Sequence, residues 1–400
     1  MTVAVTIGLL LCQWFCQGEG LIPSEPYPAG WPARQYPTLL HRAIVDGVHN
    51  DIPEGLMIGH EALRTAFGVL LASSNGSTAD EVREAMAVNL ESQNLKPLTD
   101  KFQEVGYVGA YVPPQLKIKS EYEDMVRDMG VDLVPSSANN TLERLMNKLE
   151  PISFELRDIP SSDDLPYNLR LQPEVFIVTA ASFQAEWADA DFHIENRRMR
   201  EFNVDERRQT FVETLYSLAK KRQVAHLHGL RATILLLPLK NSRVKFMVLL
   251  PDLIQGLRQL EKELEFVDLR SLLGLKMSPR RYDVRLPVMK ILTNIELADN
   301  LGFLGIRQVF NPQKADLSRI TGKKDRLWVR RFPHLTYFTL NEQGINIGKD
   351  ERRPEGRIQN NGETRNHFYA SHPFFFALLD EHKIYATGRY GQLSVDPDDM

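Results

Sequence analysis

The chain has 400 residues, of which 43% are hydrophobic and 25% charged, and its formal net charge at pH 7 is -4. This composition, without any low-complexity tract, is that of a globular protein that buries a large apolar core without disulfides or metals. A net charge so close to zero gives no general case for a protein that binds nucleic acid or an anionic membrane.

The first 20 residues, MTVAVTIGLLLCQWFCQGEG, carry an apolar run that ends in small residues. This pattern predicts a secretory signal peptide over residues 1–20 and one domain over residues 21–400. Both cysteines, Cys12 and Cys16, fall inside the leader. We therefore expect a mature chain with no disulfide and no cysteine-based metal site.

Two Asn-x-Ser/Thr triplets suit an extracellular product, at Asn75 (NGS) and Asn139 (NNT). Both are candidates for N-glycosylation. With the leader, they predict a secreted protein that acts outside the cell.

Helical patterns dominate the first third of the chain. Apolar residues recur at helical spacing over residues 38–48 and 59–72, and in TADEVREAM the pair Thr78 and Glu81 matches a capping box. Later apolar runs predict strands over residues 174–183, 231–252 (two strands), 282–291, 335–340, 374–379 and 384–388. Helices followed by strands, without a βαβ alternation, are typical of the α+β class.

No catalytic signature is present, because the sequence lacks GxSxG, HExxH, GxxxxGK[ST] and GxGxxG motifs. His226 and His228 could share a strand face, but two histidines without a third ligand favour a structural role over a metal site. We predict no enzyme, no catalytic residue, no metal and no cofactor. Three basic clusters are interpreted as solvated surface rather than a polyanion site. They are Arg197, Arg198 and Arg200; Lys220, Lys221 and Arg222; and Lys323, Lys324 and Arg326.

Six segments carry a family resemblance. They are ALRTAFGVLLASSNGSTADEVREAM, FIVTAASFQAEWADADF, TILLLPLKNSRVKFMVLLPD, LPVMKILTNIELADNLGFLGIRQVFNPQKADLSRIT, NEQGINIG and FYASHPFFFALLDEHKIYATGRYG. In this order and spacing, over nearly the whole mature chain, they resemble the serpin (serine protease inhibitor) family. The resemblance implies a single α+β domain with a large central antiparallel sheet, surrounding helices and an exposed reactive-centre loop at about residues 342–367.

The resemblance also implies a mechanism, in which a protease cleaves the loop and the loop's first half then inserts into the central sheet as a new strand. Counting from the hinge, the reactive bond would be Arg357–Ile358, which suits a trypsin-like protease. Trp187 resembles the family's tryptophan at the top of the sheet, and His334 its sheet-opening histidine. Since Thr179 replaces the usual asparagine, we expect His334 to lack its customary partner and the sheet to lack its hydrogen-bonded shutter.

The hinge, at the start of the loop, departs from the family pattern after Glu342 and Gly344, which match it. Alternate residues of an inserted strand face the core. Here these are Ile345, Ile347, Lys349, Glu351 and Arg353. The first two are bulky where the family has small residues, and burying each unpaired charge of the other three costs on the order of several kcal/mol. We expect full insertion to be strongly disfavoured.

The first hypothesis is therefore a secreted serpin-fold protein that does not trap proteases irreversibly and binds an extracellular trypsin-like protease or a receptor. The alternative is a working inhibitor of a trypsin-like serine protease, with Arg357 as bait. A second alternative, from another class, is a carrier of a small apolar ligand. We expect a monomer without a nucleic-acid or membrane partner.

Overall fold

The computed structural model describes residues 36–47, 55–86, 103–135, 174–188, 192, 197–324, 326–347 and 366–391. Several sequence predictions lie outside these residues and stay predictions. They are the signal peptide over residues 1–20, the acceptor Asn139, the hinge residue Lys349 and the reactive-bond candidates Arg357 and Ile358.

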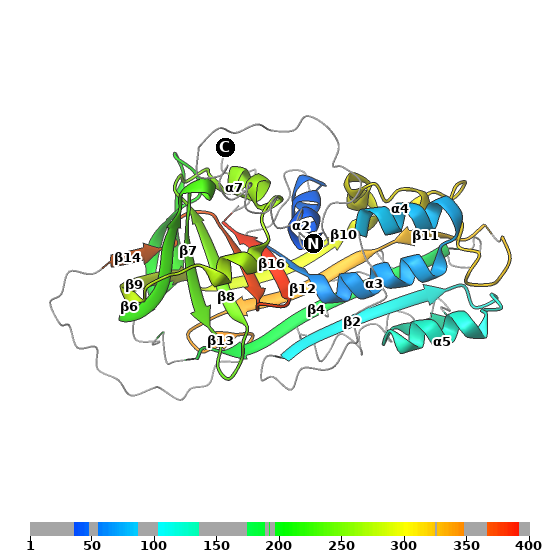
Figure 1. Ribbon diagram of the computed structural model, residues 1–400, viewed down its shortest axis with the longest axis horizontal. Coiled ribbons are helices and arrows are strands. Elements are labelled where there is room, and N and C mark those ends of the chain that lie inside the picture. Colours follow the sequence, from blue (N-terminus) through cyan, green and yellow to red (C-terminus); the bar gives the residue numbers. More distant parts are fainter. Residues whose placement is uncertain are drawn as a thin grey trace, which may run out of the picture.

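Two sheets form the frame of the described part (Figure 1). The central sheet has seven strands in the order β10-β12-β13-β4-β2-β3, with β11 beside β4. These strands are β2 Gln103–Val112, β3 Asp132–Pro135, β4 Glu174–Glu186, β10 Met289–Glu296, β11 Trp328–Arg331, β12 Pro333–Leu340 and β13 Gly344–Ile345. Four of the neighbouring pairs are antiparallel, whereas β11 and β12 run parallel to β4 and β3 runs parallel to β2.

The second sheet has nine strands in the order β1-β16-β15-β8-β7-β6-β9-β14, with β5 beside β6. These strands are β1 Gly55–Gly59, β5 Arg198–Asn203, β6 Gln209–Leu227, β7 Ala232–Pro238, β8 Lys245–Pro251, β9 Arg280–Pro287, β14 Asn366–Tyr369, β15 Phe374–Leu379 and β16 Ile384–Tyr390. The long strand β6 pairs with β9 along part of its length and with β7 farther on.

The helices flank the two sheets (Figure 1). They are α2 Tyr36–Gly47, α3 His60–Ser73, α4 Gly76–Met86, α5 Ser120–Asp128, α7 Leu257–Leu264 and α8 Leu297–Asn300, with 3₁₀ turns η5 His228–Leu230, η6 Leu269–Gly274, η7 Leu301–Leu304 and η8 Gln308–Phe310. Helix α3 packs on β2 and β4, because Leu63, Phe67 and Leu70 form one buried face at helical spacing. None of these helices is long and apolar enough to cross a bilayer. The predicted α+β class with a large sheet and surrounding helices is confirmed.

The capping box predicted at the start of α4 is wrong. The helix begins at Gly76, so Thr78 and Glu81 already lie within it. The Thr78 hydroxyl accepts a hydrogen bond from the backbone N of Asp316 at 3.1 Å, and a Glu81 carboxylate oxygen accepts one from the backbone N of Arg307 at 2.8 Å. Both side chains therefore tie α4 to the segment that precedes β11.

The strand predicted over residues 282–291 is two strands. β9 ends at Pro287 and belongs to the second sheet, whereas β10 begins at Met289 and belongs to the central sheet. A proline has no N–H to donate to a ladder, and the chain crosses from one sheet to the other directly after it.

Candidate functional site

The seam, the line along which β4 and β12 meet, is closed by a short parallel ladder. His334 lies opposite Thr179 and Tyr337 opposite Ser182. Parallel pairing is slightly less stable per residue than antiparallel pairing. A strand inserted here would replace one parallel ladder by two antiparallel ones, which makes the seam the place where this sheet can take up a further strand.

His334 lies at the end of this ladder that is farther from β13, and it is completely buried. The backbone N of Gly59 donates to its Nε2 at 3.1 Å, and its Nδ1 lies 2.8 Å from the hydroxyl of Thr179. That hydroxyl donates in turn to the carbonyl of Pro333 at 3.3 Å. This donor order requires a neutral imidazole with its proton on Nδ1. Burial lowers the pKa of His334 to about 3, so the ring stays neutral at physiological pH.

The customary asparagine is absent, but Thr179 bonds to His334 in its place, so the prediction that the sheet has no hydrogen-bonded shutter is wrong. A threonine side chain is shorter than that of asparagine, but the parallel register sets Thr179 directly beside His334. The hydroxyl therefore reaches the ring and joins β1, β12 and β4 in one buried chain of hydrogen bonds.

Beyond the Tyr337 end of this ladder, the hinge enters the sheet as strand β13. Ile345 lies opposite Leu340 of β12 and Ala185 of β4, antiparallel to both. Ile345 is fully buried, so its bulk does not keep it out of the sheet, contrary to what its size predicts. Gly344 has φ +150°, and a Cβ there would lie 2.0 Å from the carbonyl oxygen of Ala185. Only glycine fits this approach.

Asn346 directly follows β13, and its side chain bridges β4 and β12, the two strands of the seam. Its φ of +48° turns the chain out of the strand direction. On the β4 side its Nδ2 lies 2.8 Å from the Phe183 carbonyl and 3.0 Å from Ser182 Oγ. On the β12 side Nδ2 lies 3.1 Å from the Tyr337 carbonyl, and Oδ1 accepts from the Thr339 hydroxyl at 3.0 Å. The carboxamide thus stands where the next peptide group of an inserted strand would pair.

The sequence did not single out Asn346. The one available signal is that asparagine, after glycine, is the residue that most readily adopts the left-handed region. That preference marks a turn, but it does not reveal that the side chain spans two strands.

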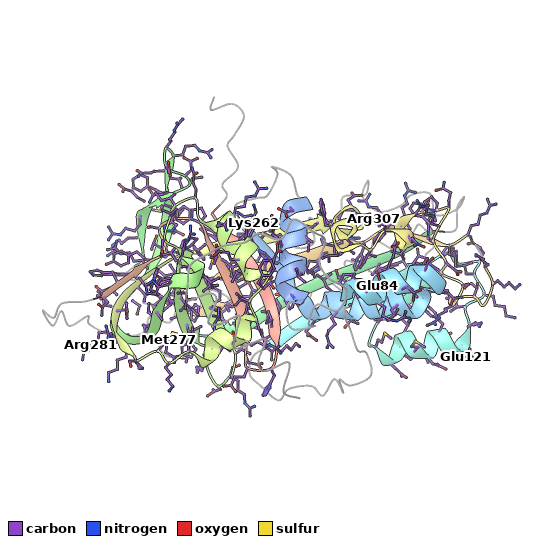
Figure 2. All side chains as sticks on the ribbon, turned by 45° about the horizontal axis from the view of Figure 1, so that its top comes forward. Glu84, Glu121, Lys262, Met277, Arg281 and Arg307 are labelled. Carbon is purple, nitrogen blue, oxygen red and sulfur yellow. The ribbon has the colours of Figure 1, made fainter. Side chains whose placement is uncertain are left out.

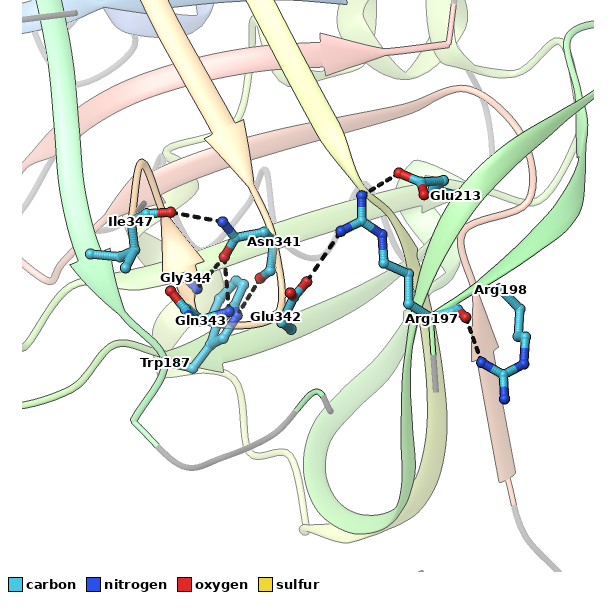
Figure 3. A network of polar contacts seen from close by, with 9 residues as sticks. All are labelled: Trp187, Arg197, Arg198, Glu213, Asn341, Glu342, Gln343, Gly344 and Ile347. Carbon is cyan, nitrogen blue, oxygen red and sulfur yellow. Dashed lines mark hydrogen bonds and ion pairs between the residues drawn. The ribbon is translucent and has the colours of Figure 1, made fainter. Parts of the chain in front are cut away.

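A turn over residues 341–347 holds β13 in place (Figure 3). The Asn341 side chain accepts from the backbone N of Gln343 at 2.8 Å and donates to the carbonyl of Ile347 at 2.8 Å. Trp187, at the end of β4, donates from its indole to the Asn341 carbonyl at 2.9 Å. The buried tryptophan therefore ties the hinge to the top of the central sheet.

An ion-pair network covers the outer side of this turn (Figure 3). The carboxylate of Glu342 lies 3.7 Å from the guanidinium of Arg197, which also pairs with Glu213. Only 20% of the Arg197 side chain and 12% of the Glu342 side chain are exposed. The interpretation of Arg197 as solvated surface is thus wrong, because this half-buried residue pairs with Glu342 of the hinge.

The chain matches one family over more than half of its length. The family described as Serpin (serine protease inhibitor) aligns with residues 163–392. The chain belongs to the serpin family. Serpins are generally protease inhibitors rather than enzymes, and they generally bind target serine proteases.

Three similar proteins match different shares of this chain. Serpin B11 of Homo sapiens is 28% identical over 209 residues, 52% of this chain and 52% of that protein, so the chain matches about half the length of this relative. Serine protease inhibitor 42Dd of Drosophila melanogaster is 22% identical over 355 residues, 84% of this chain and 91% of that protein. The crystal structure of Serpin48 from the insect Tenebrio molitor has a TM-score of 0.74 at 20% identity, covering 90% of this chain and 98% of that one. At this identity it shows the serpin fold alone.

The remaining candidates lie away from the seam of this serpin. Asn75 is exposed between α3 and α4 and stays a glycosylation candidate. His226 Nε2 lies 2.9 Å from the carboxylate of Asp252, and its Nδ1 lies 3.1 Å from Nδ1 of His228. Within the described ranges, no group of three or more His, Cys, Asp or Glu side chains could hold a metal ion.

Proposed function

We propose that this serpin is a secreted protein that binds an extracellular trypsin-like protease, or another extracellular partner such as a receptor, without trapping a protease irreversibly. The leader predicted over residues 1–20 supports secretion, and Arg357 at the counted bait position supports a trypsin-like partner. The observation that carries the proposal is the register of β13 in the seam.

Full insertion would continue that register toward His334, with Lys349, Glu351 and Arg353 following Ile345 on the core-facing side. Extending the pairs two residues at a time sets each of the three charges between one residue of β4 and one of β12. These flanking pairs, all at most 1% exposed, are Ala181 and Thr336, Thr179 and His334, and Ile177 and Phe332.

The energies oppose insertion. An unpaired charge in such surroundings costs on the order of several kcal/mol, so three cost roughly 10 kcal/mol. About ten inserted residues would gain about 1 kcal/mol per new backbone hydrogen bond. The charges therefore offset most of what the new strand contributes. Insertion would also break the bonds of the Asn346 side chain and the chain of bonds at His334.

A working inhibitor with Arg357 as bait is the second candidate. The intact hydrogen-bond chain at His334 favours it, since the shutter that the family uses to control insertion is present here in another chemical form. In this case the oppositely charged side chains of Lys349, Glu351 and Arg353 would enter the seam paired with one another.

Incubation with trypsin followed by a denaturing gel separates the two candidates. We expect clean cleavage in the loop, with the serpin recovered as two fragments and the protease still active. A covalent complex that survives boiling in SDS would overturn the proposal and establish the inhibitor.

Matched loop variants test the physical reason. Replacing Lys349, Glu351 and Arg353 by alanine removes the charges on the core-facing side, so the cleaved variant should melt at least 10 °C above its uncleaved form, because a full strand can now be added. The control, Asp350→Ala with Arg352→Ala, removes charges from the opposite face and should melt with little change after cleavage, like the parent. Equal stabilisation of both variants would show that the register argument is wrong.

A further inference from the structure

Two histidines meet where β6 ends and the chain turns into β7. His226 is the second-last residue of β6 and lies opposite Thr233 of β7, and His228 begins the 3₁₀ turn η5. Residues two apart along an extended chain project to the same side. The two rings accordingly pack edge to face, with centroids 4.5 Å apart, and both side chains are exposed. A ligand in solvent can therefore reach the pair.

The ring nitrogens that face each other are the two Nδ1 atoms, which lie 3.1 Å apart. On the far side of the His226 ring, Nε2 lies 2.9 Å and 3.0 Å from the two carboxylate oxygens of Asp252. An ionised carboxylate only accepts hydrogen bonds, so Nε2 of His226 carries the proton. In the neutral ring Nδ1 then keeps its lone pair, and this lone pair is on the side of His228.

The carboxylate of Asp252 is held beside His226 by the neighbouring strands. Asp252 directly follows β8, and its backbone N donates at 2.8 Å to the carbonyl of Arg231, the residue before β7. Among the described residues, this carboxylate pairs with His226 and with no lysine or arginine. A histidine that binds a metal almost always donates its other nitrogen to such a group, which orients the ring and makes the free nitrogen a better ligand. Asp252 has this position relative to His226.

The spacing of the two Nδ1 atoms suits one ion bound to both. At metal–nitrogen bonds of about 2.05 Å, two nitrogens lie about 2.9 Å apart at a right angle and about 3.3 Å apart in a tetrahedron. The separation of 3.1 Å between the nitrogens of His226 and His228 falls between these values. An ion bound here replaces the hydrogen between the two Nδ1 atoms, and His228 then carries its proton on Nε2.

We propose that His226 and His228 bind a divalent transition-metal ion of the Zn²⁺ and Cu²⁺ class through their Nδ1 atoms, with Asp252 as the residue that positions the first ring. Imidazole nitrogen is a preferred ligand of these ions, whereas Ca²⁺ and Mg²⁺ prefer oxygen. No third His, Cys, Asp or Glu of the described residues completes the site. The remaining positions of the ion therefore belong to water or to a donor of another molecule.

The site is separate from the seam. It belongs to the second sheet and its turns, whereas the hinge and the hydrogen bonds at His334 belong to the central sheet. Both η5 and β8 pack on α7. Figure 2 shows Lys262 of α7 well apart from Glu121 of α5. The inference therefore does not depend on whether the reactive loop inserts.

Titration of the untagged serpin with Zn²⁺ alone, followed by calorimetry, tests the site. We expect one ion to bind to the parent and none to the variant His226→Gln with His228→Gln. Asp252→Asn should weaken the affinity by about tenfold, because it removes the outer partner but neither ligand. Ca²⁺ and Mg²⁺ should not bind.

A matched control removes two histidines that do not form a pair. His367 lies on β14 and His382 in the turn between β15 and β16, and both are exposed. His367→Gln with His382→Gln should bind Zn²⁺ as the parent does. Thermal melts without metal show that each variant is folded. With Zn²⁺ the parent and this control should melt at a higher temperature, since the ion binds the folded chain, and the variant without the pair should not.

Cu²⁺ in place of Zn²⁺ identifies the ligands themselves, and it should bind more tightly than Zn²⁺. With one equivalent of Cu²⁺, electron paramagnetic resonance of the parent should show two imidazole nitrogens bound to the ion. His226→Gln and His228→Gln, each made singly, should show one.

Equal Zn²⁺ affinity of the parent and the variant His226→Gln with His228→Gln would overturn the proposal, as would a Cu²⁺ signal from a single imidazole in the parent. An equal loss of affinity in the control would also overturn it, because binding would then not be specific to the pair. An unchanged affinity in Asp252→Asn would overturn the positioning role of the carboxylate.

Discussion

The seam between β4 and β12 has two halves, called here the lower half, at His334, and the upper half, at β13. The two halves are closed by different means. In the lower half, the strands pair directly and His334 is locked by a buried, neutral chain of hydrogen bonds. In the upper half, the two residues of β13 and one side chain, that of Asn346, fill the space between the strands. The lower half is sealed by backbone pairing and burial, the upper half by a turn that is itself half-exposed. We infer that the hydrogen bonds at His334 control the opening of the sheet. β13 and the Asn346 side chain control how deeply the hinge enters it.

The largest effect is expected at Gly344, where the upper half has no room. Gly344→Ala should lower the free energy of unfolding by about 3 kcal/mol, because its Cβ would overlap the Ala185 carbonyl and its φ would be strained. Urea unfolding measures this loss. The control is Gly76→Ala, where φ is +53° and nothing lies within 4 Å of the added Cβ, so strain alone should cost about 1 kcal/mol. Equal losses would show that the close approach at β13 does not constrain the hinge.

In the lower half, Thr179→Val should cost about 2 kcal/mol in unfolding free energy. The valine keeps the shape but leaves the buried Nδ1–H of His334 and the Pro333 carbonyl without the hydroxyl. Thr179→Ser retains the hydroxyl and should cost clearly less than valine does. If valine and serine prove equally destabilising in chemical unfolding, the chain of bonds at His334 does not hold the seam.

Acid should weaken the lower half before the upper one. Above pH 6.5 His334 is neutral in both the folded and the unfolded chain, and its titration contributes nothing to stability. Below pH 6.5 the unfolded chain takes up a proton that the folded chain, with a pKa of about 3, does not. The free energy of unfolding should therefore fall by about 2 kcal/mol between pH 6.5 and pH 5 for this residue.

Burial also lowers the pKa of His60, which adds to the acid loss in the same direction. Unfolding by urea at pH 7 and pH 5 should show a shallower pH slope for His334→Gln than for the parent, by one proton. An unchanged slope in this variant would contradict the assignment of the acid sensitivity to His334.

The smallest effect is expected at Asn346. Asn346→Gly keeps the left-handed backbone but removes the bridging amide, and should cost about 1 kcal/mol. Asn346→Ala should cost more, since alanine also strains the positive φ. Amide exchange at Ile345 should quicken in both variants, and unchanged exchange would mean that the side chain does not retain β13.

Local pattern was enough to predict α2, α3, β4 and the pair β7 and β8, because helical spacing and apolar runs are written in neighbouring residues. It was not enough for α4, where Glu81 matched a capping box but binds the backbone of Arg307 instead. Whether Glu81 caps its own helix or bonds to the backbone of Arg307 depends on a segment 226 residues away in the sequence.

The site shows the same division. The hinge could be located from Glu342 and Gly344, but the partner of His334 could not be predicted. A missing asparagine indicated a missing bond, whereas the register between β12 and β4 supplied the hydroxyl of Thr179. The bridging role of Asn346 was likewise invisible, because it requires both strands of the seam to be in place.

By itself, the sequence determined the family, the α+β class and the charges at Lys349, Glu351 and Arg353, since these follow from residue order and side-chain ionisation alone. Tertiary structure decided what those charges would meet on insertion, which hydroxyl reaches His334, and that Asp252 lies beside His226. The physical reason is sheet register. It pairs residues that are far apart in the chain, and no local pattern of residues encodes which of them become neighbours.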